Sequence, residues 1–278
     1  NLLIIMLRDK ITYIANSQFP NLSANNVHIW NMSNALNRFG VLDQVITRAN
    51  HAFESNKSYL HRCKSIFSAE PKFRHKRIKT LRGLKDLDFD YGLRSYLRRE
   101  NVELVYTRAL NTAYIAIDIP SIKSLILELH EPPRSSFEIA QFKHICEHRS
   151  FKKLTCITHA LKNYICHNYQ LPSVLVDVLP DCASPVDFTR QQRVYLDQKY
   201  HCLNLDICYV GHLYEGSADI LISVAKELAN ANIHIFGGTK KDISRYSSLL
   251  RKNNITNVSL HGHVKYLEAR YIMERAKI

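Results

Sequence analysis

The chain is poor in the features that mark disordered or membrane-spanning proteins. Gly and Pro number only eight each among 278 residues, which argues against low-complexity sequence. No apolar run approaches the ~18–20 residues that a membrane-spanning helix needs. Hydrophobic residues make up 46% of the chain, enough to fill the cores of two ordinary domains. We therefore expect a globular protein of about two domains.

Cysteine pairs and metal-ligand spacings are also lacking. The seven Cys residues include no C-x-x-C pair, and several lie in apolar runs, so we expect reduced thiols and a cytoplasmic location. The 14 His residues include no H-E-x-x-H motif; the best spacings are His261-Gly-His263 and His144 with His148. A catalytic zinc needs three well-placed ligands. We expect no metal ion and no cofactor.

Positive charge, in contrast, is abundant and uneven. The net charge is +13, and the range Lys57 to Lys85 holds ten Lys or Arg (57, 62, 64, 72, 74, 76, 77, 79, 82, 85) against one acid, Glu70. Such a stretch can bind nucleic acid, dock on anionic lipid, or simply be a solvated loop. Because no nucleic-acid-binding motif accompanies it, we favour an anionic membrane surface over nucleic acid and expect no specific nucleic-acid partner.

Short apolar runs that end at glycine alternate with helical patterns from Ile207 to His263. Ile207–Val210 stops at Gly211, Ile233–Phe236 runs into Gly237 and Gly238, and Val258–Leu260 is followed by His261 and Gly262. Strands of this kind with helices between them predict a parallel, doubly wound sheet. Ligands of such sheets bind outside the carboxyl ends of the strands, where glycine lets a phosphate approach the backbone. We therefore expect this half of the chain to bind a nucleotide.

The first half repeats the alternation. We predict a polar loop over residues 16–26, a helix over 27–39, loop and short helix over 57–85, and a connecting segment over 191–200. Further strands are predicted over residues 11–15, 45–47, 102–106, 124–129, 154–157 and 174–179, with helices over 91–99, 112–118, 136–149 and 160–169. The predicted fold is α/β with two Rossmann-like domains, residues 1–185 and 186–278.

Motifs in this order resemble glycosyltransferase family 4, whose members are retaining enzymes with the GT-B fold. The matching segments are Tyr13–Pro20 with Ala24–His28, Val105–Arg108, Glu128–Pro132, Thr158–Leu161, Val178–Asp181, Tyr209–Gly216, Ile235–Gly238 and Leu260–Val264. The resemblance implies a retaining, metal-independent transfer of a sugar from a nucleotide diphosphate to a glycan or lipid-linked acceptor. It also implies a role in cell-envelope polysaccharide synthesis, in the cytoplasm or peripherally on the inner membrane face.

The resemblance assigns site residues in the first domain, on the acceptor side. His130, at the end of a strand, matches the family's His near the reaction centre, and we expect it to be catalytic; its alternative is a strand-end cap. Asn16, Asn25 and His28 would border donor and acceptor. The alternative is that these residues only form a turn, which the same sequence would also indicate. Glu131 belongs to the same acceptor side. Arg108 would bind an anionic acceptor, or else be a surface or ion-paired Arg.

In the second domain, the resemblance places the donor at six residues. These are Gly211, His212, Gly216, Gly237, Gly238 and Gly262. The family's phosphate-binding Arg and Lys fall at His212 and near Ser217, and its two later glutamates have no counterpart before Ile278. We therefore expect a partial donor domain, C-terminally truncated. The alternative is a catalytically inactive nucleotide-binding or scaffold protein of the same fold.

Overall fold

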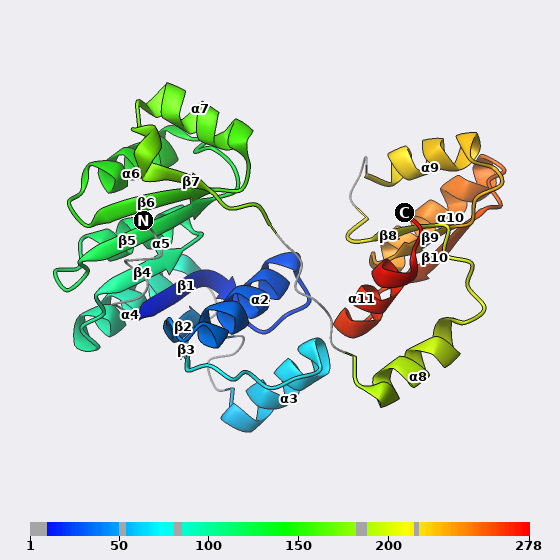
Figure 1. Cartoon of the computed structure of the whole chain (residues 1–278), viewed down its shortest axis with the longest axis horizontal. Helices are drawn as coiled ribbons and strands as arrows, with labels where there is room; N and C mark the ends of the chain where they lie inside the picture. Colours follow the sequence, from blue (N-terminus) through cyan, green and yellow to red (C-terminus); the bar gives the residue numbers. More distant parts are fainter. Residues whose placement is uncertain (1–9, 50–53, 81–84, 182–187, 214–216) are drawn as a thin grey trace. The chain divides into compact units, whose positions relative to one another are not determined.

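The computed structural model describes residues 10–49, 54–80, 85–181, 188–213 and 217–278 (Figure 1). It divides into two compact units, which are considered separately. Unit 1 comprises residues 1–64 and 69–184, and unit 2 comprises residues 65–68 and 185–278. Among the described residues, no helix is both long and apolar enough to cross a bilayer.

Unit 1 is built on a seven-stranded, wholly parallel sheet. Its strand order is β3-β2-β1-β4-β5-β6-β7, so β1 lies in the interior of the sheet and the later strands add on both sides of it. The strands are β1 (Ile11–Gln18), β2 (Leu42–Arg48), β3 (His75–Ile78), β4 (Leu104–Thr107), β5 (Ser124–Leu129), β6 (Phe151–Cys156) and β7 (Val176–Val178). This topology confirms the doubly wound α/β prediction.

The helices of unit 1 connect these parallel strands. They are α2 (Ala24–Arg38), α3 (Asn56–Phe67), α4 (Lys85–Arg99), α5 (Leu110–Ile117), α6 (Ser136–Glu147) and α7 (His159–Tyr169), with a short 3-10 turn η1 (Ser173–Leu175). Side chains that accept hydrogen bonds from first-turn amides set the starts of α2, α6 and α7 at Ser23, Ser135 and Thr158. The core includes fully buried aliphatic residues of β1, β4 and β5 and Phe142 of α6.

Unit 2 is a smaller version of the same architecture. Strands β8 (Ile207–Val210), β9 (Ile233–Phe236) and β10 (Val258–Gly262) form a parallel sheet in the order β10-β9-β8. Its helices are α8 (Arg190–Tyr200), α9 (Ser217–Glu227), α10 (Lys240–Lys252) and α11 (Tyr266–Arg275). One core cluster joins the sheet to α9 and α10, and a second joins it to α8 and α11. Both faces of the sheet are therefore covered.

Three expectations about individual segments are wrong. The polar loop over residues 16–26 is shorter, because β1 continues to Gln18 and α2 already begins at Ala24. The basic stretch contains the strand β3, whose four residues show no apolar alternation because it lies at the sheet edge beside β2 alone. Residues 190–200 form a capped helix, α8, which the polar sequence concealed because it buries only Leu196 and Tyr200.

Candidate active site

Polar side chains gather on one face of the unit 1 sheet at the carboxyl ends of β4 and β5. The parallel register pairs Tyr106 with Ile126 and Thr107 with Leu127, so that Arg108 comes level with Glu128. Side chains alternate between faces along a strand, so Tyr106 and Arg108 share a face, as do Glu128 and His130. Pairing of β1 with β4 adds Tyr13 beside Tyr106, with ring centroids 5.6 Å apart.

Glu128 is the centre of this group. It is only 4% exposed, and its carboxylate accepts hydrogen bonds from the Tyr106 hydroxyl and from His130 Nε2, the latter at 2.5 Å. Arg108 Nε lies 3.2 Å from Glu128 Oε1. Burial alone would raise the pKa of Glu128, but the hydrogen bonds from His130 and Tyr106 and the Arg108 charge outweigh it and lower the pKa. The carboxylate is therefore ionised near neutral pH.

The hydrogen bonds of His130 assign its tautomer. Nε2 faces the Glu128 carboxylate, which can only accept, so Nε2 carries the proton. Nδ1 lies 3.0 Å from Arg108 Nη2, which can only donate, so Nδ1 is the acceptor. Both ring nitrogens are thus engaged within the protein, and the ring is held in one orientation.

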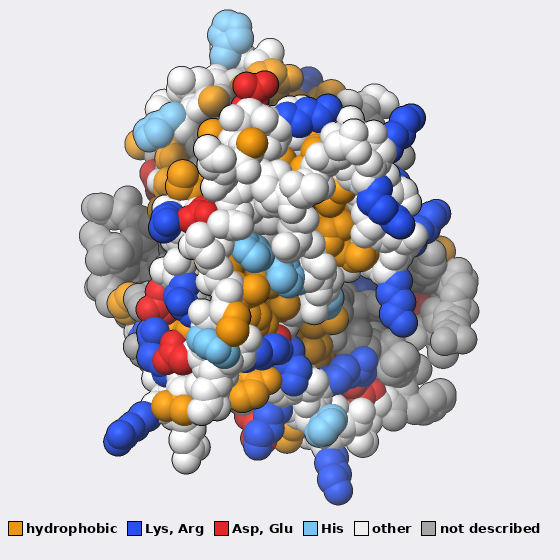
Figure 2. Space-filling model, turned by 90° about the vertical axis from the view of Figure 1, so that its right-hand side faces the viewer, with side chains coloured by type: hydrophobic (Ala, Val, Ile, Leu, Met, Phe, Trp, Pro, Cys, Tyr) orange, Lys and Arg blue, Asp and Glu red, His pale blue; other side chains and the backbone are white. Residues whose placement is uncertain are grey.

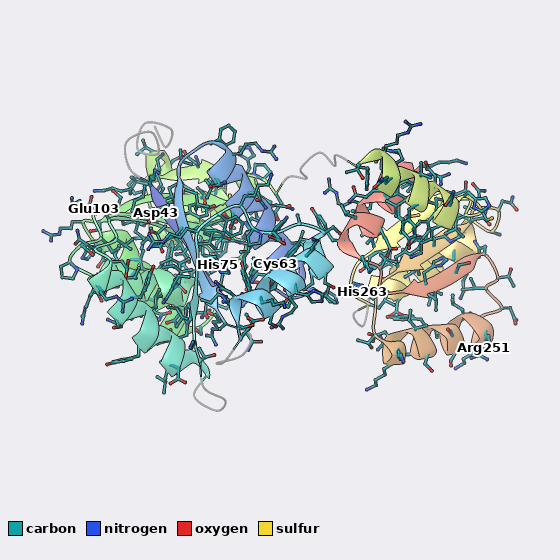
Figure 3. All side chains as sticks on the ribbon, turned by 90° about the horizontal axis from the view of Figure 1, so that it is seen from below. Asp43, Cys63, His75, Glu103, Arg251 and His263 are labelled. Carbon is teal, nitrogen blue, oxygen red and sulfur yellow. The ribbon has the colours of Figure 1, made fainter. Side chains whose placement is uncertain are left out.

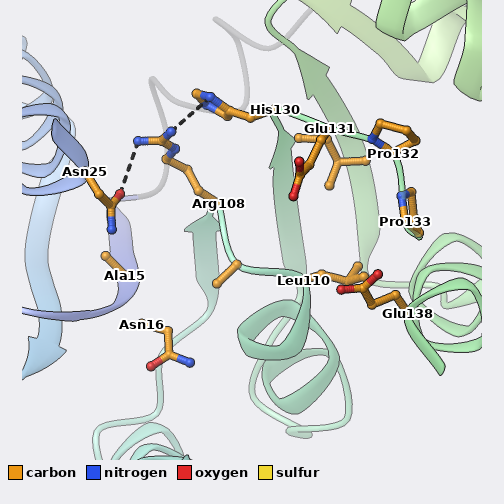
Figure 4. Close-up of a pocket in the computed structure, with 12 residues that line it drawn as sticks. Ala15, Asn16, Asn25, Arg108, Leu110, His130, Glu131, Pro132, Pro133 and Glu138 are labelled. Atoms are coloured by element: carbon orange, nitrogen blue, oxygen red, sulfur yellow. Dashed lines mark hydrogen bonds between the residues drawn. The ribbon is translucent and has the colours of Figure 1, made fainter. Parts of the chain in front are cut away.

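Arg108 uses each of its three guanidinium nitrogens inside the same cluster. Besides the contacts to Glu128 and His130, Nη1 donates to Asn25 Oδ1 at 3.4 Å. Its side chain is 19% exposed. Figure 4 shows the guanidinium between Asn25 of α2 and His130, as dashed lines indicate. Of the two expectations for Arg108, this geometry supports the ion pair.

His28 of α2 lies beside this group and shares no hydrogen bond with it among the described residues. Its buried Nε2 has no hydrogen-bond partner in the described part of the chain and lies 3.9 Å from Glu128 Oε1, while Nδ1 lies 3.7 Å from Asp181 Oδ1. Burial, and then the Arg108 charge, lower the pKa of His28, so the ring is neutral at pH 7.

His28, Glu128 and Asp181 form the one group of the described residues that brings three metal-ligand atoms together, all within 4.8 Å. However, the Glu128 oxygen nearest His28 is also the one that Arg108 contacts. A metal cation there would face a guanidinium at close range, which is unfavourable. The pair spacings expected from sequence do not add a third ligand: His144 bonds to Asp118, and His261 bonds to His234.

A pocket of about 320 Å³ opens beside this cluster. Its lining includes five of the residues expected from sequence: Asn16, Asn25, Arg108, His130 and Glu131. Ala15, Ala109, Leu110, Leu129, Pro132, Pro133 and Glu138 complete it (Figure 4). Asn16 is fixed by Arg48 of β2, whose Nε donates to its side-chain oxygen. His28, expected in the same group, does not line the pocket.

The sequence reasoning did not identify Glu128, Tyr106, Tyr13 or Arg48 as site residues. The available signal was Glu128 itself, a charged residue within the apolar strand Ser124–Leu129, two positions before His130. Tyr13 carries a buried hydroxyl without a hydrogen-bond partner among the described residues. Burial raises its pKa, against the Arg108 charge, so it stays protonated. These residues need the fold to be recognised, because they lie on four different strands.

In unit 2, the glycines expected to bind the donor pack against one another. The Gly211 amide donates to the Phe236 carbonyl at 3.0 Å, and the Gly237 amide donates to the Gly262 carbonyl at 2.6 Å. A Cβ on Gly237, at φ +127°, would lie 1.9 Å from the Gly211 carbonyl oxygen. Glycine is required here for close backbone approach. In this structure those two amides are engaged and do not point to a ligand.

The helix start after β9 is also occupied. Thr239 caps α10, and the Asp242 carboxylate accepts from the Thr239 amide at 2.8 Å. Because Asp242 already supplies negative charge to this N-terminus, α10 is a weaker phosphate site than its position implied. Gly238 packs against Leu213, and the His212 carbonyl accepts from the Tyr209 hydroxyl. Gly216 lies outside the described residues.

Comparisons with known proteins show the fold. No family model and no curated protein matches the chain. Sucrose-phosphate synthase from Thermosynechococcus elongatus matches with a TM-score of 0.64 at 14% identity, over 95% of this chain and 73% of that one. A TarM variant from S. aureus, solved with UDP and α-GlcNAc-glycerol, matches with a TM-score of 0.63 at 10% identity, over 92% and 78%.

An epimerase has the same fold. UDP-GlcNAc 2-epimerase from Neisseria meningitidis, bound to UDP-GlcNAc, matches with a TM-score of 0.55 at 13% identity, over 96% of this chain and 76% of that one. The matches confirm the GT-B-like fold with two Rossmann-like domains. Because one fold serves different reactions, the function is argued from the site.

Proposed function

We propose that the chain is a glycosyltransferase that moves a sugar from a nucleotide diphosphate to a glycan or lipid-linked acceptor with retention. The observation that carries the proposal is the cluster of Glu128, Arg108 and His130 beside a pocket in a GT-B-like fold. Two of the solved neighbours, by their titles, are a sucrose-phosphate synthase and a TarM variant in complex with UDP and α-GlcNAc-glycerol.

The cluster suits the positioning of a reacting sugar. Glu128 and Arg108 hold the His130 ring in one orientation at the pocket, so a bound sugar meets an ordered imidazole. Groups fixed before the substrate arrives lower the barrier, because they need no reorganisation during reaction. In this proposal His130 contacts the transferred sugar, and Arg108 and Glu128 are positioning residues.

The second candidate is a nucleotide-binding protein without catalysis. Two features of unit 2 favour it: Asp242 occupies the start of α10, and His212 stands where the family resemblance implies an Arg. A neutral His supplies no fixed cation for a departing diphosphate. The two candidates share donor binding and differ in turnover.

The proposal also includes a cytoplasmic enzyme that docks peripherally on anionic lipid through residues 57–85 and acts in cell-envelope synthesis. Lys57 and Lys64 of α3, and Lys72, Arg74 and Lys79 beyond it, are exposed. Arg62 and Arg77 are instead paired with the buried Glu54 and belong to the structure of unit 1. Elsewhere, Lys and Arg are scattered over the face in Figure 2 among apolar and polar side chains.

The test is a two-step assay on the whole chain. Binding of UDP, GDP, ADP and CMP sugars is measured first by thermal shift, since a ligand at 100 times its Kd adds about 2.7 kcal/mol of stability. Turnover of any binding donor is then followed by NMR with a mixture of glycoside and polyol acceptors. An α-linked product from an α-linked donor supports the proposal, whereas an inverted product overturns retention.

Matched variants make the assay specific. His130→Ala is expected to keep donor binding and lose at least tenfold in kcat, in the range of positioning and acid–base effects. Glu103→Ala, at an exposed ion pair with Lys123, is the control and should keep full activity. Donor binding without any turnover would select the second candidate, and a UDP-GlcNAc changed only at C2 would indicate an epimerase.

A further inference from the structure

The pocket beside His130 has a charge pattern that discriminates among acceptors. Three of its lining side chains carry a fixed charge: Arg108, Glu131 and Glu138. The first is positive and the other two are negative, and a fourth charge, the Glu128 carboxylate, lies directly behind Arg108. The pocket is therefore not a positively charged site, although the chain as a whole carries a net charge of +13.

Arg108, the single Lys or Arg among the described lining residues, is already neutralised. All three guanidinium nitrogens of Arg108 have protein partners: Glu128 at 3.2 Å, His130 at 3.0 Å and Asn25 at 3.4 Å. A phosphate or carboxylate that recruited Arg108 would have to displace it from the buried Glu128. That displacement would leave a buried carboxylate without its cation, which is costly.

The two acids have different hydrogen-bond partners. Glu138 belongs to the capping box of α6. Its carboxylate accepts hydrogen bonds from the backbone amides of Arg134 at 2.8 Å and Ser135 at 3.0 Å. These backbone hydrogen bonds, with that of Ser135 the largest, lower the pKa of Glu138, so it remains ionised. Glu131 is exposed and pairs with Arg134. The two carboxylates outnumber the one guanidinium of Arg134, so a net negative charge opposes an anion that enters the pocket.

The remaining lining is typical of a site for hydroxyl groups. Carboxylate and side-chain amide groups of Glu131, Asn16 and Asn25 offer acceptors and donors, and Leu110, Pro132 and Pro133 supply apolar walls for C–H faces. A cavity of about 320 Å³ lies at the small end of ligand sites, which span roughly 300–1,000 Å³.

We propose that this pocket takes the uncharged, hydroxyl-rich end of the acceptor, a neutral sugar or polyol, and discriminates against phosphate and carboxylate groups. This inference rests on the proposed function in one respect: the ligand is called an acceptor because the chain is proposed to transfer a sugar. The binding preference itself concerns the pocket alone. Any anionic part of the acceptor would then lie outside it.

The test is a binding measurement that needs no turnover. Methyl-labelled chain is titrated with matched pairs: methyl glucoside against glucose 1-phosphate, and glucose against glucuronic acid. Leu110 and Leu129 line the pocket, so their methyl signals report on it, while Leu205 and Leu250 in the cores of unit 2 serve as reference. We expect the neutral member of each pair to shift the pocket signals with a Kd about tenfold lower than its anionic partner.

A charge-removing variant sharpens the result. In Glu131→Gln with Glu138→Gln the two negative charges are gone, and Gln at the third helical position can still form the capping box. The ratio of the Kd values of the anionic and neutral members of each pair is expected to fall by at least half in this variant. Equal or tighter binding of the anionic members to the wild-type chain, or no shift at Leu110 and Leu129 with the neutral ones, overturns the inference. Absence of transfer in the assay above bears only on the proposed function.

Discussion

The two sheets end in opposite ways at their carboxyl edges. In unit 1 the strands β4 and β5 lead into charged side chains, Arg108 and His130, that are fixed by the buried Glu128. In unit 2 the strands β8 and β9 lead into glycines whose backbones touch. The edge in unit 1 positions charged side chains, whereas the edge in unit 2 brings the backbones of glycines into close contact. The same architecture therefore supports two kinds of site, and substitutions should affect them differently.

The largest effect is expected at Gly237. In Gly237→Ala the new Cβ would overlap the Gly211 carbonyl oxygen at 1.9 Å, and φ is +127°, so we expect a loss of about 4 kcal/mol or more in the unfolding free energy of unit 2. Circular dichroism in urea measures the loss. Trp30, the one Trp of the chain, lies on α2 in unit 1, and its fluorescence transition should not move.

The matched control for Gly237 is Gly262→Ala. Gly262 also has a positive φ, +71°, but a Cβ there meets nothing within 4 Å. The expected cost is about 1 kcal/mol, from backbone strain alone. If both variants lose equally, close packing of the glycines is not what makes Gly237 necessary.

The second effect is at Glu128. In Glu128→Ala the Arg108 guanidinium and the Tyr106 hydroxyl lose their acceptor inside unit 1, and we expect a loss of about 3 kcal/mol. The Trp30 fluorescence transition in urea measures it. Glu103→Ala, which removes an exposed partner of Lys123, should cost less than about 1 kcal/mol. If Glu128→Ala left the unfolding free energy nearly unchanged, the cluster would not be coupled to folding.

The third effect is a pH dependence of unit 1. His75 of β3, labelled in Figure 3, lies with Nδ1 2.5 Å from the Tyr59 hydroxyl and Nε2 2.8 Å from the Thr47 hydroxyl. Burial, followed by the Arg77 charge, lowers the pKa of His75 to about 3. The unfolded chain, with a His pKa near 6.5, binds the proton more readily.

The stabilisation from neutral His75 is therefore complete above pH 6.5 and is lost as the pH falls toward 3. Between pH 7 and pH 5 we expect a decrease of about 2 kcal/mol in the unfolding free energy followed by Trp30. His75→Gln should flatten this slope, whereas His61→Gln, at an exposed position of α3, should keep it. An unchanged slope in His75→Gln would assign the dependence to other groups, such as His28.

The smallest effect concerns lipid docking. Reversing the exposed Lys57 and Lys64 of α3 to Glu should weaken binding to phosphatidylserine vesicles by about 1 kcal/mol for each charge removed, with the fold intact. Vesicle co-sedimentation measures binding, and Lys226→Glu with Lys252→Glu in unit 2 is the control. Equal losses in both pairs would mean that net charge, not the α3 surface, drives docking.

Much of the fold could be predicted, because the periodicity of apolar residues and the glycines that follow the strands match the observed helices and strands. Strand β5 was predicted with the bounds Ser124–Leu129 that the structure shows, and all three strands of unit 2 were expected before or at their glycines. Strand β3 could not be predicted, since His75–Ile78 is charged and gains its stability from pairing with β2. Helix α8 failed for a similar reason, because its polar sequence buries only two side chains.

The site was predictable only one residue at a time. The family resemblance placed His130, Arg108, Asn16, Asn25 and Glu131, and the structure brings these five around one pocket. What joins them could not be read from the sequence, because Glu128 and Tyr106 act through cross-strand register. The glycines of unit 2 were expected at their places, but whether their amides face a ligand or one another depends on distances between strands.

The strand order of unit 1 has a consequence for how the protein is made. Strand β1 is synthesised first and becomes an interior strand, with β2 and then β3 adding on one side and β4 to β7 on the other. Each later strand therefore emerges from the ribosome after its first neighbour. Since domains fold from the N-terminus during synthesis, this sheet can grow outward in the order of translation, and each new strand finds its first neighbour already made.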